Sequence, residues 1–126
     1  MFYFCDPDGK TEYVYSKEKW PVDERTPYLG KFTFNNIIAE NSEVCAGYFY
    51  GLPEMFIKEI NINDSVFTFK EDAKPDKPAM MSFIEDHVKS GFVFNNVEKV
   101  NLKNVVVKGQ VGKEFNSDGN GIVNYE

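Results

Sequence analysis

The sequence predicts an all-β fold in which short strands stack as the coils of a solenoid. Aromatic residues, which are enriched in strands, make up 16% of the chain. Apolar and polar residues alternate over short runs that Asn or Asp interrupts, as in strands joined by tight corners. One short template also recurs along the chain, which indicates units that bury their apolar faces by stacking on one another.

The template consists of three apolar positions and one turn-forming position. Its first two apolar positions are three residues apart, the third follows two residues later, and the turn former comes two residues after that. The copies are Leu29, Phe32, Phe34 and Asn36; Ile57, Ile60, Ile62 and Asp64; and Val97, Val100, Leu102 and Asn104. A further corner recurs at Phe92, Phe94, Asn95 and Asn96. An antiparallel β-sandwich also has alternating strands and turns, but it does not explain this repeated order, so the solenoid is favoured.

The chain divides into three parts within one domain of 126 residues. Residues 1–28 are polar and rich in turn signals, and they are expected to form a long N-terminal loop or cap. Residues 29–109 carry the coils. Residues 110–126 form a turn-rich tail, which is expected to return as a last strand at Ile122 and Val123.

Two segments between the coils interrupt the strand pattern. Two prolines exclude Glu71–Met80 from any central strand. The apolar spacing in "MMSFIEDHVKSG" predicts a short helix that ends at Gly91. The lone histidine, His87, is expected to be exposed on that helix, and the neighbouring acidic pairs are expected to be solvated.

Composition argues against several classes of partner. The net charge of −6 argues against nucleic acid or an anionic membrane surface. No run approaches the ~20 apolar residues of a membrane span, and the start "MFYFCDPDGK" lacks signal-peptide features, so a cytoplasmic location is expected. The two cysteines, Cys5 and Cys45, are too few for a disulfide scaffold or a zinc site, and both are expected to be reduced. No metal or cofactor is expected.

Four stretches carry a resemblance to a known family. They are "PVDERTPYLGKFTFNNI", "AGYFYGLPE", "AKPDKPAMMSFIE" and "GFVFNNVEKVNLKNVVVKG". Together they resemble the C-terminal portion of bacterial glycoside hydrolase family 28 proteins, the polygalacturonase-like pectin hydrolases, from about Phe2 to about Gly109. The most specific parts are Gly51–Glu54 and Pro78–Met81. The resemblance implies a right-handed parallel β-helix and a galacturonate-type polysaccharide as partner.

The resemblance also implies an inverting hydrolysis that this chain lacks the residues to perform. Such enzymes use two carboxyl groups about 6.5–9.5 Å apart, and the family supplies its active centre from Asn-Thr-Asp, Asp-Asp, Gly-His-Gly and Arg-Ile-Lys motifs. None is present: His87 lies in "EDHVKS", Arg25 lies in "DERTPY", and "NSDGNG" is interpreted as a turn. No catalytic residue is therefore carried over, and the chain is expected to be inactive alone.

The stretch "AGYFYGLPE" contains the candidate substrate-binding residues. Tyr48 and Tyr50 could stack on the apolar faces of sugar rings, and Glu54 could accept hydrogen bonds from sugar hydroxyls. The alternative is that one tyrosine packs in the core and Gly51–Pro53 is simply a corner. In the first loop, Lys17, Lys19 and Arg25 could meet a uronate carboxylate.

Two expectations concern function and association. The alternative to a hydrolase segment is a non-catalytic solenoid module that binds carbohydrate or protein, or that is purely structural. A β-helix cut across its axis exposes unpaired strand edges, which template association. We therefore expect the isolated chain to form a homodimer, or to cover its open end with the segment Phe2–Tyr28.

Overall fold

The computed structural model describes residues 16–79, 81 and 83–126. Across these residues the chain forms eight β-strands and no helix, which confirms the all-β prediction. The strands are β1 (Lys31–Asn35), β2 (Ile38–Ser42), β3 (Cys45–Tyr50), β4 (Ile57–Phe69), β5 (Ser90–Asn95), β6 (Val97–Lys108), β7 (Phe115–Ser117) and β8 (Ile122–Tyr125). Within the described ranges, no helix is long and apolar enough to cross a membrane. Most of the expected N-terminal cap lies outside the described residues.

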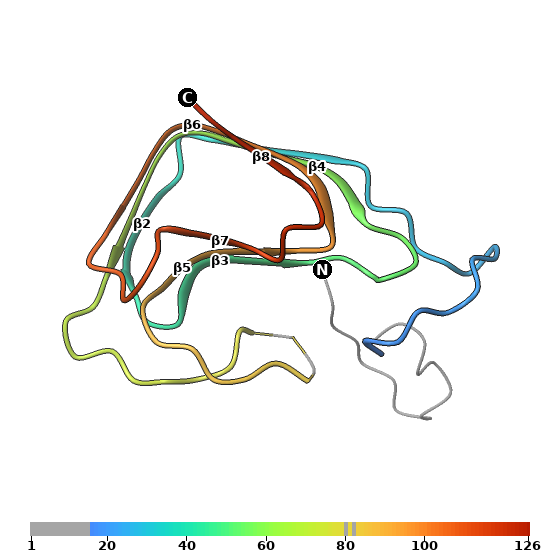
Figure 1. Cartoon of the computed structure of the whole chain (residues 1–126). Coiled ribbons are helices and arrows are strands. Elements are labelled where there is room, and N and C mark those ends of the chain that lie inside the picture. The colour runs from blue at the N-terminus through green and yellow to red at the C-terminus, as the bar shows by residue number, and fades with distance from the viewer. Residues whose placement is uncertain (1–15, 80, 82) are drawn as a thin grey trace.

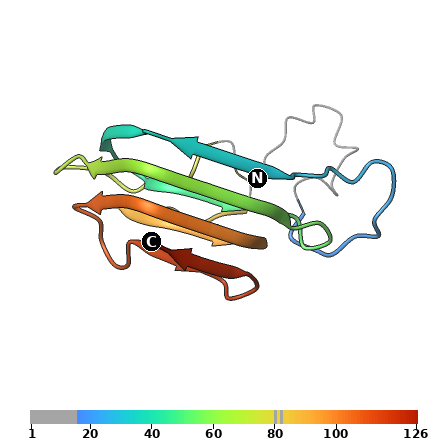
Figure 2. The ribbon, with the colours of Figure 1, turned by 90° about the horizontal axis from the view of Figure 1, so that it is seen from above.

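The strands form two parallel sheets that the chain visits in turn. In the larger sheet β1, β4, β6 and β8 are successive neighbours and β2 also pairs with β4, whereas β3, β5 and β7 form the smaller sheet. Figure 1 shows the strands of each sheet superposed on opposite sides of the molecule, and Figure 2 shows them stacked in order from β1 to β8. Every pairing between these strands is parallel, which excludes the antiparallel sandwich.

The register of the larger sheet matches the template found in the sequence. Phe32 pairs with Ile60 and Ile60 with Val100, while Ile57 pairs with Val97. The third apolar positions pair in the same way, from Phe34 to Ile62 and from Ile62 to Leu102. The expected stacking of equivalent positions is therefore confirmed.

The turn formers of the template lie at corners of the backbone. Asn36, Asp64 and Asn104 have φ values of 56°, 48° and 50°, in the left-handed region that Asn and Asp tolerate better than other non-glycine residues. Asn96 has a φ of 52° and makes a similar corner between β5 and β6. In β6 the corner at Asn104 explains the interrupted alternation of apolar and polar residues, because Val100 and Leu102 are buried before it and Val107 is buried after it.

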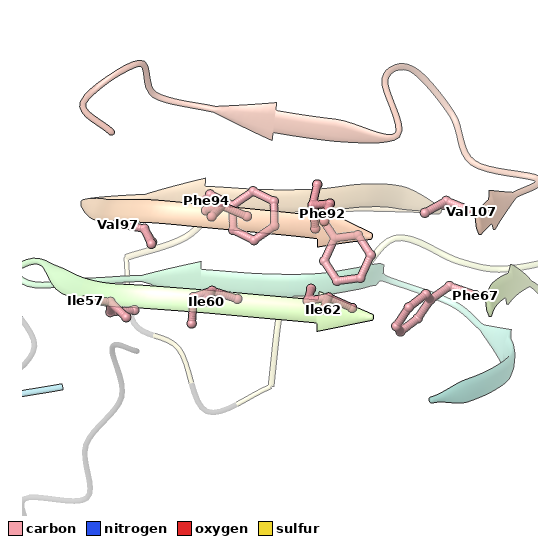
Figure 3. Close-up of a cluster of buried hydrophobic side chains, with 10 residues drawn as sticks. Ile57, Ile60, Ile62, Phe67, Phe92, Phe94, Val97 and Val107 are labelled. Atoms are coloured by element: carbon pink, nitrogen blue, oxygen red, sulfur yellow. The ribbon is translucent and has the colours of Figure 1, made fainter. Parts of the chain in front are cut away.

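The core lies between the two sheets. Buried aliphatic side chains of β4 and β6 form one cluster with buried phenylalanines of β5, and Figure 3 shows Ile60, Ile62 and Phe94 among its members. The phenylalanines stack along the smaller sheet: Phe94 lies parallel to Phe49 and to Phe92, with ring centroids 5.5 Å and 5.8 Å apart. Offset parallel rings add about 0.5–1.5 kcal/mol beyond the burial of their area.

Asparagine side chains form a second stack, along the larger sheet. Asn101 Nδ2 donates to Asn61 Oδ1 at 2.7 Å, and Asn124 Nδ2 donates to Asn101 Oδ1 at 2.8 Å. These residues occupy paired positions on β4, β6 and β8. A slip in register would therefore break the amide ladder as well as move apolar residues out of the core.

Two expectations about individual elements need correction or extension. The predicted helix ending at Gly91 is wrong: the described residues of that segment are irregular, His87 makes an isolated antiparallel bridge to Asp76, and Gly91 lies inside β5. The predicted last strand is confirmed as β8, but the sequence reading missed β7, which pairs with β5.

The buried hydroxyl of Ser65 holds one corner and provides a first stability prediction. Ser65 is 1% exposed; its Oγ accepts from the Ile37 N–H at 3.0 Å and donates to the Asn63 carbonyl at 2.7 Å. Ser65→Ala leaves both backbone groups without this partner, so we expect a loss of about 1–3 kcal/mol in the free energy of unfolding. Urea denaturation measures this loss in stability, with Ser16→Ala as the control. Equal denaturation midpoints for the two variants would contradict the role of the Ser65 hydroxyl in the corner.

Candidate functional site

The two candidate tyrosines lie together on the outer side of the smaller sheet. Tyr48 and Tyr50 are two residues apart on β3 and therefore face the same way. Phe49, between them, faces inward and packs against the core. Gly47 also faces the core, where an added Cβ would meet the Phe92 ring at 2.6 Å. The idea that one tyrosine packs in the core is therefore wrong, because Phe49 fills that position.

A pocket of about 430 Å³ adjoins both tyrosines. Its walls come from the first loop, the end strand β3, the segment before β5, and the end of β5. The lining residues are Lys17, Tyr48, Tyr50, Phe83, Ile84, Glu85 and Asn95. The pocket thus offers two phenol rings, one ammonium, one carboxylate and one amide within a single hollow.

The phenols of this pocket remain protonated at neutral pH. Burial raises the pKa of Tyr48, and the neighbouring Tyr50, Glu85 and Cys45 raise it further. Burial also raises the pKa of Tyr50, with a smaller contribution from Asp118. Both hydroxyl groups can therefore donate as well as accept hydrogen bonds. The Lys17 ammonium lies 5.9 Å from the centroid of the Tyr50 ring, within range of a cation–π contact.

His87 lies beside Tyr48 and is not the exposed helical residue that the sequence predicted. It is half-buried, its ring meets Tyr48 edge-on at 5.3 Å between centroids, and its Nδ1 is 2.9 Å from Ser90 Oγ. Its Nε2 is buried with no hydrogen-bond partner among the described residues. The irregular segment places it there, because its backbone pairs with Asp76. His87 therefore supports the position of Tyr48.

The loop after β3 forms a tight backbone corner that bounds the pocket beyond Tyr50. The Gly51 N–H donates to the Asn95 carbonyl at 2.9 Å, and Asn96 Nδ2 donates to the Gly51 carbonyl at 3.1 Å. An added Cβ at Gly51 would lie 2.2 Å from the Asn96 carbonyl oxygen. Gly51–Pro53 is thus a corner, as the alternative interpretation proposed, and it positions the adjacent Tyr50 without joining the pocket itself.

Glu54 is not part of the pocket. It lies in the loop after that corner, and its Oε2 is buried without a hydrogen-bond partner among the residues that the structure describes. The structure therefore brings together two of the three predicted site residues, Tyr48 and Tyr50, with Lys17, one of the basic residues that the sequence analysis considered in the first loop. Arg25 of that loop is engaged elsewhere: its Nη2 lies 2.7 Å from Asp23 Oδ2.

Sequence reasoning missed four residues of the pocket: Phe83, Ile84, Glu85 and Asn95. The first three belong to the segment interpreted as a helix, and Asn95 was assigned only to a corner. No local sequence pattern indicates that these four residues lie next to Tyr48 and Tyr50. Their proximity to the tyrosines depends on how β3 and β5 pair.

Thiol and metal chemistry receive little support in the described part of the chain. Cys45 is a free, half-buried thiol whose pKa is raised by burial, which disfavours the reactive thiolate. This confirms the expectation for Cys45, while Cys5 lies outside the described residues. No cluster of three or more His, Cys, Asp or Glu residues suited to a metal ion occurs in residues 16–79, 81 and 83–126.

Comparison with protein-family models, with curated proteins and with solved structures finds no match to this chain.

Proposed function

We propose that the chain is a right-handed parallel β-helix segment of polygalacturonase type that binds a galacturonate-type polysaccharide on the outer side of its smaller sheet. Three features support the solenoid: parallel sheets visited in turn, equivalent residues in register, and left-handed Asn or Asp corners. The kinship to glycoside hydrolases is supported by the sequence stretches around Tyr48–Glu54 and Pro78–Met81.

The single observation that carries the binding proposal is the pair of tyrosines at the pocket wall. Both rings lie on the outer side of the smaller sheet, where the core does not require them, and both adjoin a pocket of about 430 Å³. This volume is within the range of ligand pockets, about 300–1,000 Å³. The flat apolar face of a pyranose would stack on a phenol ring, because aromatic side chains bury large apolar areas.

The polar groups of the pocket suit an acidic sugar. The Lys17 ammonium would pair with a uronate carboxylate, while Asn95 and Glu85 would bond to ring hydroxyls. Glu85 also sets a limit, because its own charge disfavours a carboxylate placed beside it. The sugar acid would therefore point toward Lys17 and its hydroxyls toward Glu85.

The proposed activity is binding without cleavage. The four catalytic motifs of the resembled family have no counterpart in this sequence. A non-catalytic module that binds polysaccharide is therefore the function we favour for the chain on its own. The expected outcome with polygalacturonate is no release of reducing ends above a heat-killed control.

Titration calorimetry with short oligogalacturonates tests the binding proposal. We expect Tyr50→Ala to weaken binding at least tenfold, which corresponds to about 1.4 kcal/mol, because the platform beside Lys17 is lost. Tyr28→Ala is the matched control, since Tyr28 is 67% exposed and lies outside the pocket; it should bind like the parent. Equal affinity of both variants, or no binding by the parent, would exclude this site.

Neutral galactose oligomers separate the role of charge from that of stacking. If Lys17 pairs with the uronate carboxylate, the parent should bind the neutral oligomer more weakly than the acidic one. Lys17→Gln should remove this difference in affinity between the two oligomers. Lys19→Gln is the control, because Lys19 lies outside the pocket lining. The same preference in parent and Lys17→Gln would rule out the assigned contact.

A further inference from the structure

The last strand of the larger sheet has a free edge. β8 pairs with β6 on one side and, within the described residues, with no strand on its other side. Figure 2 shows β8 as the final strand of the stack, at the end opposite β1. An unpaired strand edge presents a row of N–H and C=O groups that a further strand can bind. The β8 edge is therefore a place where a second polypeptide can extend the sheet.

The side chains at this edge are apolar and largely exposed. On the core side, Tyr125 is 60% exposed, whereas its register partner Leu102 is 3% exposed. Phe115 of β7 is half-buried and meets the Tyr125 ring with centroids 5.5 Å apart. On the outer side, Ile122 is 65% exposed. A strand added at this edge would remove this apolar surface from water, which favours association.

The backbone of β8 directs two residues toward the free edge. The Glu126 N–H donates to the Leu102 carbonyl at 2.7 Å, and the Glu126 carbonyl accepts from the Asn104 N–H at 2.9 Å. The backbone groups of Glu126 therefore face β6. Alternate residues of a strand direct their backbone groups to opposite sides. Val123 and Tyr125 consequently direct their N–H and C=O groups to the free edge.

These groups fit a second copy of the same strand in antiparallel orientation. Val123 can pair with Tyr125 of the second copy, because both residues bond at the free edge and both point to the core side. A two-fold axis at Asn124 produces this pair twice, and each pair exchanges both of its N–H···O bonds. A shift of one residue would place core-facing residues opposite outward-facing ones. Strand geometry therefore selects the register centred on Asn124.

The asparagine ladder fits the same two-fold axis. Asn124 Nδ2 donates to Asn101 Oδ1 at 2.8 Å, and Asn124 is the last amide of the ladder. A primary amide carries two donor hydrogens and an oxygen with two lone pairs. On the two-fold axis Asn124 faces its own counterpart, so each amide can donate its second hydrogen to the oxygen of the other. The ladder would then continue across the interface without a break.

We propose that β8 binds β8 of a second copy in antiparallel orientation about a two-fold axis at Asn124. The contact joins the larger sheets of two chains into one sheet. A two-fold contact uses the same surface on both copies, so association stops at the dimer. The pocket proposed to bind sugar adjoins β3, and β7 rather than β3 is the strand at this end of the smaller sheet. The proposal is therefore independent of sugar binding.

The competing arrangement stacks β8 on β1 of the next copy. It would continue the parallel register and place Thr33 beside Asn124, because Thr33 pairs with Asn61 in the same ladder position. A head-to-tail contact of this kind does not close and builds open chains. The antiparallel contact is favoured because parallel pairing is slightly less stable per residue. It also keeps an amide at the ladder position, where the parallel contact offers a hydroxyl.

Disulfide trapping tests the two-fold register. Opposed residues of a non-hydrogen-bonded antiparallel pair have Cα atoms about 4.5 Å apart, within the range of about 4.4–6.8 Å for disulfides. In a Cys5→Ser, Cys45→Ser background, Asn124→Cys alone should therefore give a covalent dimer on mild oxidation with diamide. Thr33→Cys is the matched control, because Thr33 is exposed at the same ladder position on the other end strand. We expect the control to cross-link at least tenfold more slowly.

Two results of this experiment would overturn the proposal. Equal cross-linking rates for the two variants would mean that the β8 edge does not prefer its own copy. Fastest cross-linking in an equimolar mixture of Asn124→Cys and Thr33→Cys chains would assign the head-to-tail contact instead.

Sedimentation velocity on the unmodified chain gives an independent measurement. We expect a reversible monomer–dimer equilibrium at moderate salt, which screens the repulsion between two chains of net charge −6 each. Tyr125→Pro removes an N–H of the free edge and should weaken the dimer at least tenfold. Tyr125→Ala is the control, since it keeps that N–H and should weaken the dimer less. A parent that stays monomeric at every concentration, or equal dimer affinities of the two variants, would also overturn the proposal.

Discussion

Phe94→Ala is expected to lower the free energy of unfolding by about 3–5 kcal/mol. The Phe94 side chain is 1% exposed and lies in the middle of the aromatic stack, parallel to the rings of Phe49 and Phe92. Truncation would remove both ring contacts and leave a cavity between the sheets. The loss has no local remedy, because the neighbouring rings belong to paired strands whose register fixes their positions.

Denaturation in guanidinium chloride, extrapolated to water, measures this loss. Val111→Ala is the control, because its side chain is 64% exposed and its truncation should change stability by no more than about 0.5 kcal/mol. If Phe94→Ala lost less than about 1 kcal/mol, the ring would not face the core, and the assigned register of the smaller sheet would be wrong.

Gly51→Ala is expected to destabilise the protein by about 3 kcal/mol or more, although it adds a single methyl group. That methyl would lie 2.2 Å from the Asn96 carbonyl oxygen and 2.9 Å from the Ile57 nitrogen. Both atoms are backbone, and the Ile57 N–H donates to that same carbonyl at 3.0 Å. The corner can accommodate Ala only if the backbone at Asn96 and Ile57 moves apart, which would break this bond.

The matched control is Gly30→Ala. An added Cβ at Gly30 would meet only the Tyr28 ring, at 3.3 Å, and that exposed side chain can move away. We expect a change below about 1 kcal/mol for Gly30→Ala in the same denaturation experiment. Similar losses for the two variants would show that Gly51 is not required by close backbone approach. Because Gly51 adjoins Tyr50, Gly51→Ala should also weaken the proposed binding of sugar.

The stacked parallel strands of the larger sheet could be predicted from sequence because their signal is local and repeated. Ile60 and Val100 occupy the same place in the template, and only a stacked arrangement buries both. The corners could be predicted for a similar reason, since few residues other than glycine tolerate a positive φ as readily as Asn36 and Asn104 do. Periodicity of two and the chemistry of single corner residues carry this information without any knowledge of the partner strand.

The segment before β5 shows where local patterns fail. Its apolar residues fit a short helix, yet His87 instead pairs with Asp76 across the segment, and Ile84 is buried at 5% exposure. A pattern this short has no decisive helical preference, so contacts with the smaller sheet decide its conformation. The strand β7 was missed for a related reason, because three residues are too few to show alternation.

Three of the seven pocket residues, Lys17, Tyr48 and Tyr50, were visible as candidates in the sequence. Tyr48 and Tyr50 share a face because strand geometry alone requires it. The burial of the two tyrosines and their contact with Lys17 and Glu85 depend on segments that meet only in the folded chain. The position of Glu54 outside the pocket depends on the same segments. A resemblance carried by short stretches indicated the region but could not assign these contacts.

Residue order alone specifies the strand template, its Asn and Asp corners and the alternation that separates Phe49 from the two tyrosines beside it. These features follow from the backbone preferences of single residues and from the two-residue period of a strand. The register of the smaller sheet, the asparagine ladder and the pocket at Tyr50 became visible only in the folded chain. Each of them arises from burial or hydrogen bonding between distant segments. Such contacts depend on which strands become neighbours, and no local stretch of residues encodes that choice.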